Sequence, residues 1–323
     1  MVIKFQYLKS IFPGVVLALI FCLFSQGINN VLAIEIFGTE KSPISTVLIA
    51  ILLGILMGNA FTPRPGMMIG LDFTQQYILK LGIIFLGIRL SFADFIKFGS
   101  VAIPLVIFCV LGVLILIKLL IKKVPISSKM SYLIAIGTSV CGATAIVATA
   151  PVINAKKTEV AYAIANITLF GVIAMLVYPY FAEWYFDNNA LEAGLFLGTS
   201  IHETSQVAAA GLIYDQQFNN PETLDVATVT KLIRNTFLVI LIPLFAFLYN
   251  RGEFKEQKYS ILSIFPYFVL GFIGMIVLRN FGDQLFSVES DNFYAWSKFI
   301  EYLKILATVF LTMAMAAVGI SIN

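Results

Sequence analysis

The chain has 323 residues, of which 59% are hydrophobic and only 12% are charged, and its formal net charge is +3. Soluble globular proteins carry about 25% charged residues, so this composition excludes a soluble protein and requires a lipid environment. The small positive charge lies in connecting loops and bears on membrane orientation, so nucleic acid is not expected as a partner.

Ten apolar stretches follow one another along the chain, and most have the length of a membrane-spanning helix. A helix of about 17 to 25 mainly apolar residues crosses a bilayer. The stretches lie at residues 11–33, 43–60, 74–91, 100–121, 131–153, 159–181, 191–213, 226–249, 261–281 and 299–320. The sequence therefore predicts an all-α membrane protein with about ten hydrophobic segments, in which residues 1–323 form a single transmembrane transporter domain.

The first stretch is similar to a secretory signal, because Lys4 and Lys9 precede an apolar run and residues 31–33 offer a cleavage site. The run continues through Gly27 and further spans follow it, so we expect an uncleaved first helix. By the positive-inside rule, the two lysines place the N-terminus in the cytoplasm.

Two stretches interrupt the expected alternation of sides. Lysines flank 131–153 at both ends, whereas acidic residues flank 191–213 at both ends. Positive loops face the cytoplasm, so the simplest topology has eight full spans and two opposed segments that enter from opposite faces. Asp215 and Asp225 are then expected in an external loop, and Arg89 is expected to be an interfacial anchor.

The two odd segments also resemble each other. The string Gly-Thr-Ser-Val at 137–140 matches Gly-Thr-Ser-Ile at 198–201, and both continue into small residues. Residues 86–91 likewise resemble 317–321, at a position of opposite predicted orientation. Inverted repeats with discontinuous helices are typical of secondary transporters. We therefore predict an inverted-repeat transporter with two broken or re-entrant helices.

The first of these segments, 137–149, offers groups that suit an anion. Helices broken at glycine expose backbone amides and carbonyls in the membrane, and a half-helix N-terminus carries a partial positive charge. The alternative is that small residues only allow close helix packing. The candidate substrate-binding residues are Thr138, Ser139, Cys141, Gly142 and Thr144.

The second segment is polar at seven of eight positions from 199 to 206. Ionisable groups inside a membrane are costly and usually have a function. We expect Glu203 to carry a proton or bind a cation, and His202 to contact an anion or respond to pH. The alternative is an interfacial position, where both side chains reach water. The candidates are Thr199, Ser200, His202, Glu203, Thr204, Ser205 and Gln206.

Further candidates lie on the helices that follow the two segments. Lys231, Arg234 and Asn235 share one helical face by their spacing. The two cations are placed to neutralise an anion or Glu203, and snorkelling toward the membrane surface is the alternative. Asn166 is a candidate hydrogen-bond donor to the same site.

Metal, disulfide and catalytic sites are not expected. The three cysteines form no CxxC pair, and His202 is the only histidine. No cofactor is expected, although Na⁺ or H⁺ is a candidate coupling ion. An intramembrane enzyme with His202 and Glu203 as acid and base is the alternative from another class. The chain lacks a nucleophile beside a base and a long soluble loop, so we expect a protein that is not an enzyme.

Three long strings carry a family resemblance: residues 79–91 with Pro-Gly-Met at 65–67 before them, residues 137–146, and residues 202–209. In this order they resemble the YeiH-type sulfate exporter family of bacterial inner-membrane proteins, from about residue 13 to the last residue. The resemblance implies a multi-pass transporter of the cell inner membrane that exports sulfate or a related organosulfonate by alternating access. Its partners would be a small anionic substrate and the lipid bilayer, and a homo-oligomer stays open.

The chain is also distantly similar to the bile-acid and arsenite transporter superfamily, in which two broken helices cross at the centre. Residues 203–207 are similar to its Glu-Thr-Gly-x-Gln string, from which Ser205 and Val207 depart. A sodium-coupled organic-anion importer is therefore the alternative within transport. Members of the YeiH-type family usually continue beyond the position of Asn323, so the resemblance implies that a final helix is missing.

Overall fold

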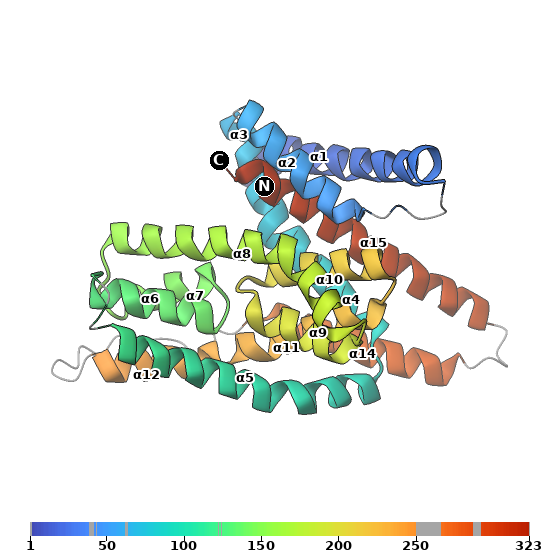
Figure 1. Cartoon of the computed structure of the whole chain (residues 1–323). Helices are drawn as coiled ribbons and strands as arrows, with labels where there is room; N and C mark the ends of the chain where they lie inside the picture. The colour runs from blue at the N-terminus through green and yellow to red at the C-terminus, as the bar shows by residue number, and fades with distance from the viewer. Residues whose placement is uncertain are drawn as a thin grey trace. The chain divides into compact units, whose positions relative to one another are not determined.

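The computed structural model describes residues 2–38, 42, 44–61, 64–121, 123, 125–249, 266–286 and 292–322 (Figure 1). Every regular element in these ranges is helical. The elements are α1 (Val2–Val31), η1 (Leu32–Ile36), α2 (Thr46–Ala60), α3 (Pro65–Phe73), η2 (Thr74–Ile78), α4 (Leu79–Leu86), η3 (Gly87–Arg89), α5 (Phe92–Leu120), α6 (Ser128–Ser139), α7 (Ala143–Thr149), α8 (Lys157–Phe186), α9 (Ala190–Ser200), α10 (Thr204–Phe218), α11 (Pro221–Thr236), α12 (Leu238–Tyr249), α14 (Phe268–Leu285) and α15 (Phe293–Ser321).

These helices account for the ten predicted segments. Within the described ranges, seven helical segments are long and apolar enough to cross a membrane, and α2 is a shorter apolar helix. The remaining two segments are the interrupted pairs α6–α7 and α9–α10. The all-α membrane fold predicted from the sequence is confirmed. Residues 261–265 of one predicted stretch, and Asn323, on which the expectation of a missing helix rests, lie outside the described residues.

The contacts divide the chain into two compact units. The first comprises Met1–Asp94, Ala208–Asp225 and Phe268–Asn323, and the second comprises Phe95–Val207 and Val226–Tyr267. The boundaries at 207/208 and 225/226 fall inside helices, so α10 and α11 each contribute residues to both units.

In the first unit, α15 packs against α2 and α4, α14 packs against α4, and α1 packs against α3 (Figure 1). Glycine makes the α2–α15 contact close, because a Cβ added to Gly54 would lie 2.6 Å from the carbonyl oxygen of Ala316 and 2.9 Å from the Cα of Gly319. Gly14 and Gly70 meet in the same way where α1 crosses α3. Small residues allow helices in lipid to approach closely and gain van der Waals contact.

Replacing Gly54 by leucine is expected to push α2 away from α15 and to destabilise the protein by about 1 to 3 kcal/mol, the usual cost of overpacking. Thermal unfolding of the detergent-solubilised protein measures the effect. Gly27→Leu is the matched control, because an added Cβ at Gly27 meets nothing within 4 Å. Equal melting temperatures for the two variants would contradict the packing argument.

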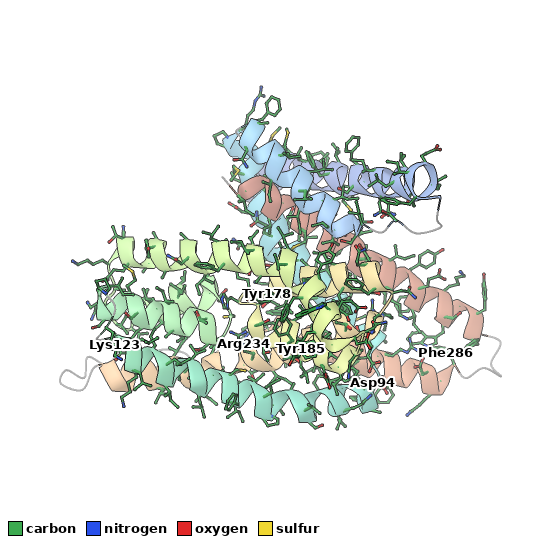
Figure 2. The ribbon with its side chains drawn as sticks, viewed as in Figure 1. Asp94, Lys123, Tyr178, Tyr185, Arg234 and Phe286 are labelled. Atoms are coloured by element: carbon green, nitrogen blue, oxygen red, sulfur yellow. The ribbon has the colours of Figure 1, made fainter. Side chains whose placement is uncertain are left out.

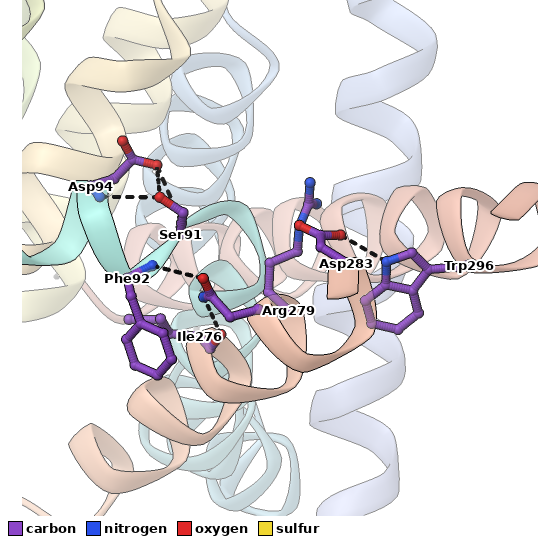
Figure 3. Close-up of polar contacts among 8 residues, drawn as sticks. Ser91, Phe92, Asp94, Ile276, Arg279, Asp283 and Trp296 are labelled. Atoms are coloured by element: carbon purple, nitrogen blue, oxygen red, sulfur yellow. Dashed lines mark hydrogen bonds and ion pairs between the residues drawn. The ribbon is translucent and has the colours of Figure 1, made fainter. Parts of the chain in front are cut away.

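Local polar contacts fix the start of α5 and the pairing of α14 with α15 (Figure 3). The backbone N–H of Asp94 donates to Ser91 Oγ at 3.1 Å, and the backbone N–H of Ser91 donates to Asp94 Oδ2 at 3.2 Å. This reciprocal arrangement is a capping box, which the Ser-x-x-Asp spacing allows. Trp296 Nε1 donates to Asp283 Oδ1 at 2.8 Å, and Arg279 forms an ion pair with the same carboxylate at 2.6 Å.

In the second unit, α6, α7 and α9 pack against α8, and α7 also contacts α12. Its core is a cluster of buried apolar side chains that includes Leu133, Ile146 and Leu241. Large apolar side chains such as Phe108 stay exposed along α5 and are suited to lipid contact. The exposed Trp184 and Tyr185 near the end of α8 are of the kind that forms aromatic belts at membrane interfaces. Tyr185 is labelled in Figure 2.

Candidate substrate site at the two broken helices

The first break separates α6 from α7 at residues 140–142. Gly142 has φ 67° and ψ −127°, a conformation that residues with a Cβ rarely adopt. The Gly142 N–H donates to the carbonyl of Gly137 at 3.0 Å, which closes the end of α6. An added Cβ on Gly137 would lie 2.9 Å from Ile146, so this glycine also lets α7 fold back closely. The predicted break is confirmed, and glycine is its local cause.

The second break separates α9 from α10 at residues 201–203. The Glu203 N–H donates to Gln206 Oε1 at 3.3 Å, which is one half of a capping box and starts α10. Asn235 of α11 adds a second support, because its Nδ2 donates to Thr204 Oγ1 at 3.0 Å. This break is confirmed too, whereas entry of the two segments from opposite faces stays a prediction.

Arg234 of α11 binds the ends of both α6 and α9. Its Nε donates to the carbonyl of Ser139 at 2.8 Å, and its Nη1 donates to the carbonyls of Thr199 at 2.7 Å and Ile201 at 3.1 Å. Its Nη2 donates to the carbonyl of Thr138. Thr138 and Thr199 occupy the same position in the two matched Gly-Thr-Ser strings. One side chain, Arg234, which is 2% exposed, therefore holds equivalent positions of both helix ends; it is labelled in Figure 2.

Lys231, one turn earlier on α11, binds the residues of the breaks themselves. Its Nζ donates to the carbonyls of Val140 at 2.8 Å, Ile201 at 3.2 Å and His202. The last carbonyls of a helix lack partners within it and carry a partial negative charge, so buried cations suit them. Lys231 is fully buried and Arg234 nearly so, which excludes snorkelling for both.

Glu203 carries the one carboxylate among the candidate residues, and this carboxylate also lies at the two breaks. Its side chain lies against Gly142, where an added Cβ would be 2.7 Å from Glu203 Cγ. The carboxylate interacts with the backbone N–H of Ala143, the first residue of α7, and with the hydroxyl of Ser205. A negative charge is favourable at the start of a helix. The two breaks thus contact each other through a side chain of one and the backbone of the other.

Several predicted hydroxyl groups are bonded within their own helices. Ser139 Oγ donates to the carbonyl of Ala135 at 2.6 Å, and Ser200 Oγ donates to that of Phe196 at 2.6 Å. Thr199 makes the same kind of bond to Leu195. The chain groups nearest the two cations are therefore backbone carbonyls, while these hydroxyl hydrogens are used by the helix backbone.

The remaining candidates are less closely joined. Asn166 donates to the carbonyl of Tyr162 in its own helix at 3.0 Å, and Thr144 is exposed. Cys141 is half-buried in the first break. Among the candidate residues, all of which the structure describes, His202 Nδ1 and Asn235 Oδ1 are buried without a hydrogen-bond partner. These two atoms add unused polar capacity beside the second break.

A second polar cluster lies in the first unit, around Arg89. Arg89 Nε lies 2.8 Å from Asp225 Oδ1, and Arg89 Nη2 lies 3.6 Å from Asp215 Oδ2 and 3.0 Å from the carbonyl of Pro221. The prediction of a loop for the two acids was wrong, whereas their external side and the interfacial position of Arg89 stay predictions. Asp215 lies in α10 and Asp225 in α11, where ion pairing with Arg89 offsets part of the cost of burying their charges.

The chain is similar over most of its length to the proteins of one family. The family model described as "Conserved hypothetical protein 698" matches residues 13–323. A UPF0324 membrane protein of Streptococcus agalactiae serotype V is 33% identical over 315 residues, covering 98% of this chain and 88% of that protein. The chain belongs to the UPF0324 membrane protein family. The YeiH-type resemblance seen in the sequence is thereby confirmed.

Two further UPF0324 membrane proteins are similar over most of their length. That of Fusobacterium nucleatum is 32% identical over 295 residues, covering 90% of this chain and 83% of the relative. That of Streptococcus pyogenes serotype M3 is 32% identical over 315 residues, covering 96% and 87%. No solved structure matches the chain. The UPF0324 family and the apolar helices together support a multi-pass membrane protein.

Proposed function

We propose that this protein is a secondary active transporter of the bacterial inner membrane that exports a small anion, sulfate or an organosulfonate, by alternating access. The convergence of both helix breaks on Lys231 and Arg234 carries the proposal. Transporters bind substrates and coupling ions where discontinuous helices expose backbone groups inside the membrane. A purely structural membrane helix gains nothing from two such interruptions held by buried charges, which are costly.

The charge of the site favours an anion. Lys231 and Arg234 contribute two positive charges and Glu203 one negative charge, so these side chains sum to +1. Each break pairs a helix end of partial charge about −0.5 with a helix start of about +0.5, so the backbone contribution roughly cancels. This net positive charge attracts a small anion and disfavours a free cation. The carbonyls that could bind a free cation already accept hydrogen bonds from Lys231 and Arg234.

The N-terminus of the transporter faces the cytoplasm in this proposal, because Lys4 and Lys9 precede the first span. Export then means that the site loads from the side on which the N-terminus lies. Glu203 is the residue proposed to couple transport to an ion gradient, since its carboxylate belongs to one break and contacts the other.

Flux of radiolabelled sulfate, or of the small organosulfonate isethionate, across proteoliposome membranes tests the proposal. Wild-type protein is expected to give flux above empty liposomes. Glu203→Gln should lower that flux about tenfold or more, because a charge-assisted hydrogen bond contributes about 1.5 to 3 kcal/mol. Glu192→Gln is the control, since Glu192 is an exposed carboxylate in the first turn of α9. Wild-type flux no higher than that of empty liposomes for both anions would contradict the proposal.

A further inference from the structure

The ammonium of Lys231 has an unusual set of partners. All three of its hydrogen-bond acceptors are backbone carbonyls, those of Val140, Ile201 and His202. One belongs to the first break and two belong to the second, and all three residues lie outside the helices. An ammonium has three N–H donors, so these three carbonyls use its full donor capacity.

Carbonyls of this kind are ligands for a monovalent cation. In transporters with broken helices, unwound backbone carbonyls and half-helix C-terminal ends coordinate the sodium ion that drives transport. The Lys231 ammonium carries the same single charge as sodium, and it is held by the same class of oxygen ligand. The side chain is fully buried, so the charge is fixed at this place and does not exchange with water.

We propose that the Lys231 ammonium is a built-in replacement for a sodium ion at the junction of the two breaks. The protein then needs no sodium to hold the breaks together, and transport does not depend on sodium. The carbonyls form a latent cation site, which accepts a free monovalent cation once the ammonium is removed. The statement about sodium-independent transport rests on the proposed function, whereas the latent cation site does not.

Two neighbouring charges bear on the latent site. Arg234 repels a free cation, and Glu203, which interacts electrostatically with Lys231, attracts one. After removal of the Lys231 charge, these two side chains nearly cancel each other. A sodium ion entering beside the carbonyls then restores the original balance of charge.

The melting temperature of the detergent-solubilised full chain tests the latent site, in sodium chloride and in choline chloride at equal ionic strength. Lys231→Ala is expected to melt lower than wild type in choline. Sodium should raise its melting temperature in a concentration-dependent way, by about 3 to 6 °C at ten times the dissociation constant. Wild type should melt at the same temperature in both salts. In Lys231→Met the longer side chain fills the space. The melting temperature of this variant should therefore be lower than that of wild type and should not change with sodium.

Two results would overturn the inference. One is a Lys231→Ala protein whose melting temperature responds to none of lithium, sodium, potassium or ammonium ions, which would make Lys231 only a helix cap. The other is a wild-type protein whose melting temperature is higher in sodium chloride than in choline chloride. This measurement remains decisive if Lys231→Ala fails to fold. If sodium raises the melting temperature of Lys231→Ala but wild-type proteoliposomes show no anion flux, the latent site is upheld and the proposed function is contradicted. The two failures are therefore distinguishable.

Discussion

Replacing Arg234 by methionine is expected to destabilise the protein by about 2 to 5 kcal/mol and to abolish transport, because one substitution releases both helix ends. The guanidinium donates to four carbonyls, two at the end of α6 and two at the end of α9. Methionine fills a similar volume but donates no hydrogen bond, so four carbonyls lose the guanidinium as a donor, and of these the Ile201 carbonyl keeps Lys231. Thermal unfolding and labelled-sulfate flux measure the two effects.

Arg279→Met is the matched control for that experiment. Arg279 pairs with Asp283 one turn away on α14, and its side chain is 27% exposed. Such a pair contributes about 0 to 1 kcal/mol. A stability loss in Arg234→Met no larger than that in Arg279→Met would show that the helix breaks are held by something other than the guanidinium. Arg234→Lys separates charge from geometry, since an ammonium has fewer donors and cannot reach both helix ends in the same way.

Replacing Gly142 by alanine is expected to reduce anion flux strongly in a protein that still folds. The φ of 67° and ψ of −127° cost a residue with a Cβ about 1 to 3 kcal/mol. The added Cβ would also lie 2.7 Å from Glu203 Cγ, so the carboxylate has to move away from the start of α7. The substitution therefore separates the two breaks without removing a charge.

Flux and melting temperature should be compared with those of Gly112→Ala. An added Cβ at Gly112, within α5 of the same unit, meets nothing within 4 Å, so wild-type flux is expected there. The contact between the two breaks would be unimportant for transport if Gly142→Ala carried anions at the wild-type rate.

The helical segments could be predicted from the sequence because their cause is local. A run of about 20 apolar residues can satisfy its backbone in lipid only as a helix. The breaks could be predicted for a similar reason, since glycine and polar residues recur at matched positions, 137–139 and 198–200. The interruption of α11 from α12 at Phe237 carries no comparable signal and was missed.

The partners of Lys231 and Arg234 could not be predicted in the same way. Both cations bind backbone carbonyls, and every residue has a carbonyl, so no side-chain pattern marks the acceptors. The sequence showed only that the two residues share a helical face. Their common target depends on how α11 packs against two breaks that lie about 30 and about 90 positions away in the chain.

Asp215 and Asp225 show where charge alone misleads. Charged residues usually mark loops, so the acids around residue 220 indicated a long external connection. The actual turn is short, with Asn219 at φ 54° and Pro221 as the first residue of α11. Asn in a left-handed conformation and Pro at a helix start are local signals of such a turn. The sequence Asn-Asn-Pro therefore predicts the short turn, whereas the acidic residues around it do not.

Anion-dependent stabilisation of the wild-type protein tests whether the joined breaks form an anion site. Isethionate and sulfate should be compared at millimolar concentration and constant ionic strength, because sulfate at high concentration stabilises proteins in general. An anion site at the breaks should give a concentration-dependent rise in melting temperature with at least one of the two anions and none with an uncharged sulfone of similar size. A melting temperature that stays constant with both anions, or rises equally with the sulfone, would contradict it.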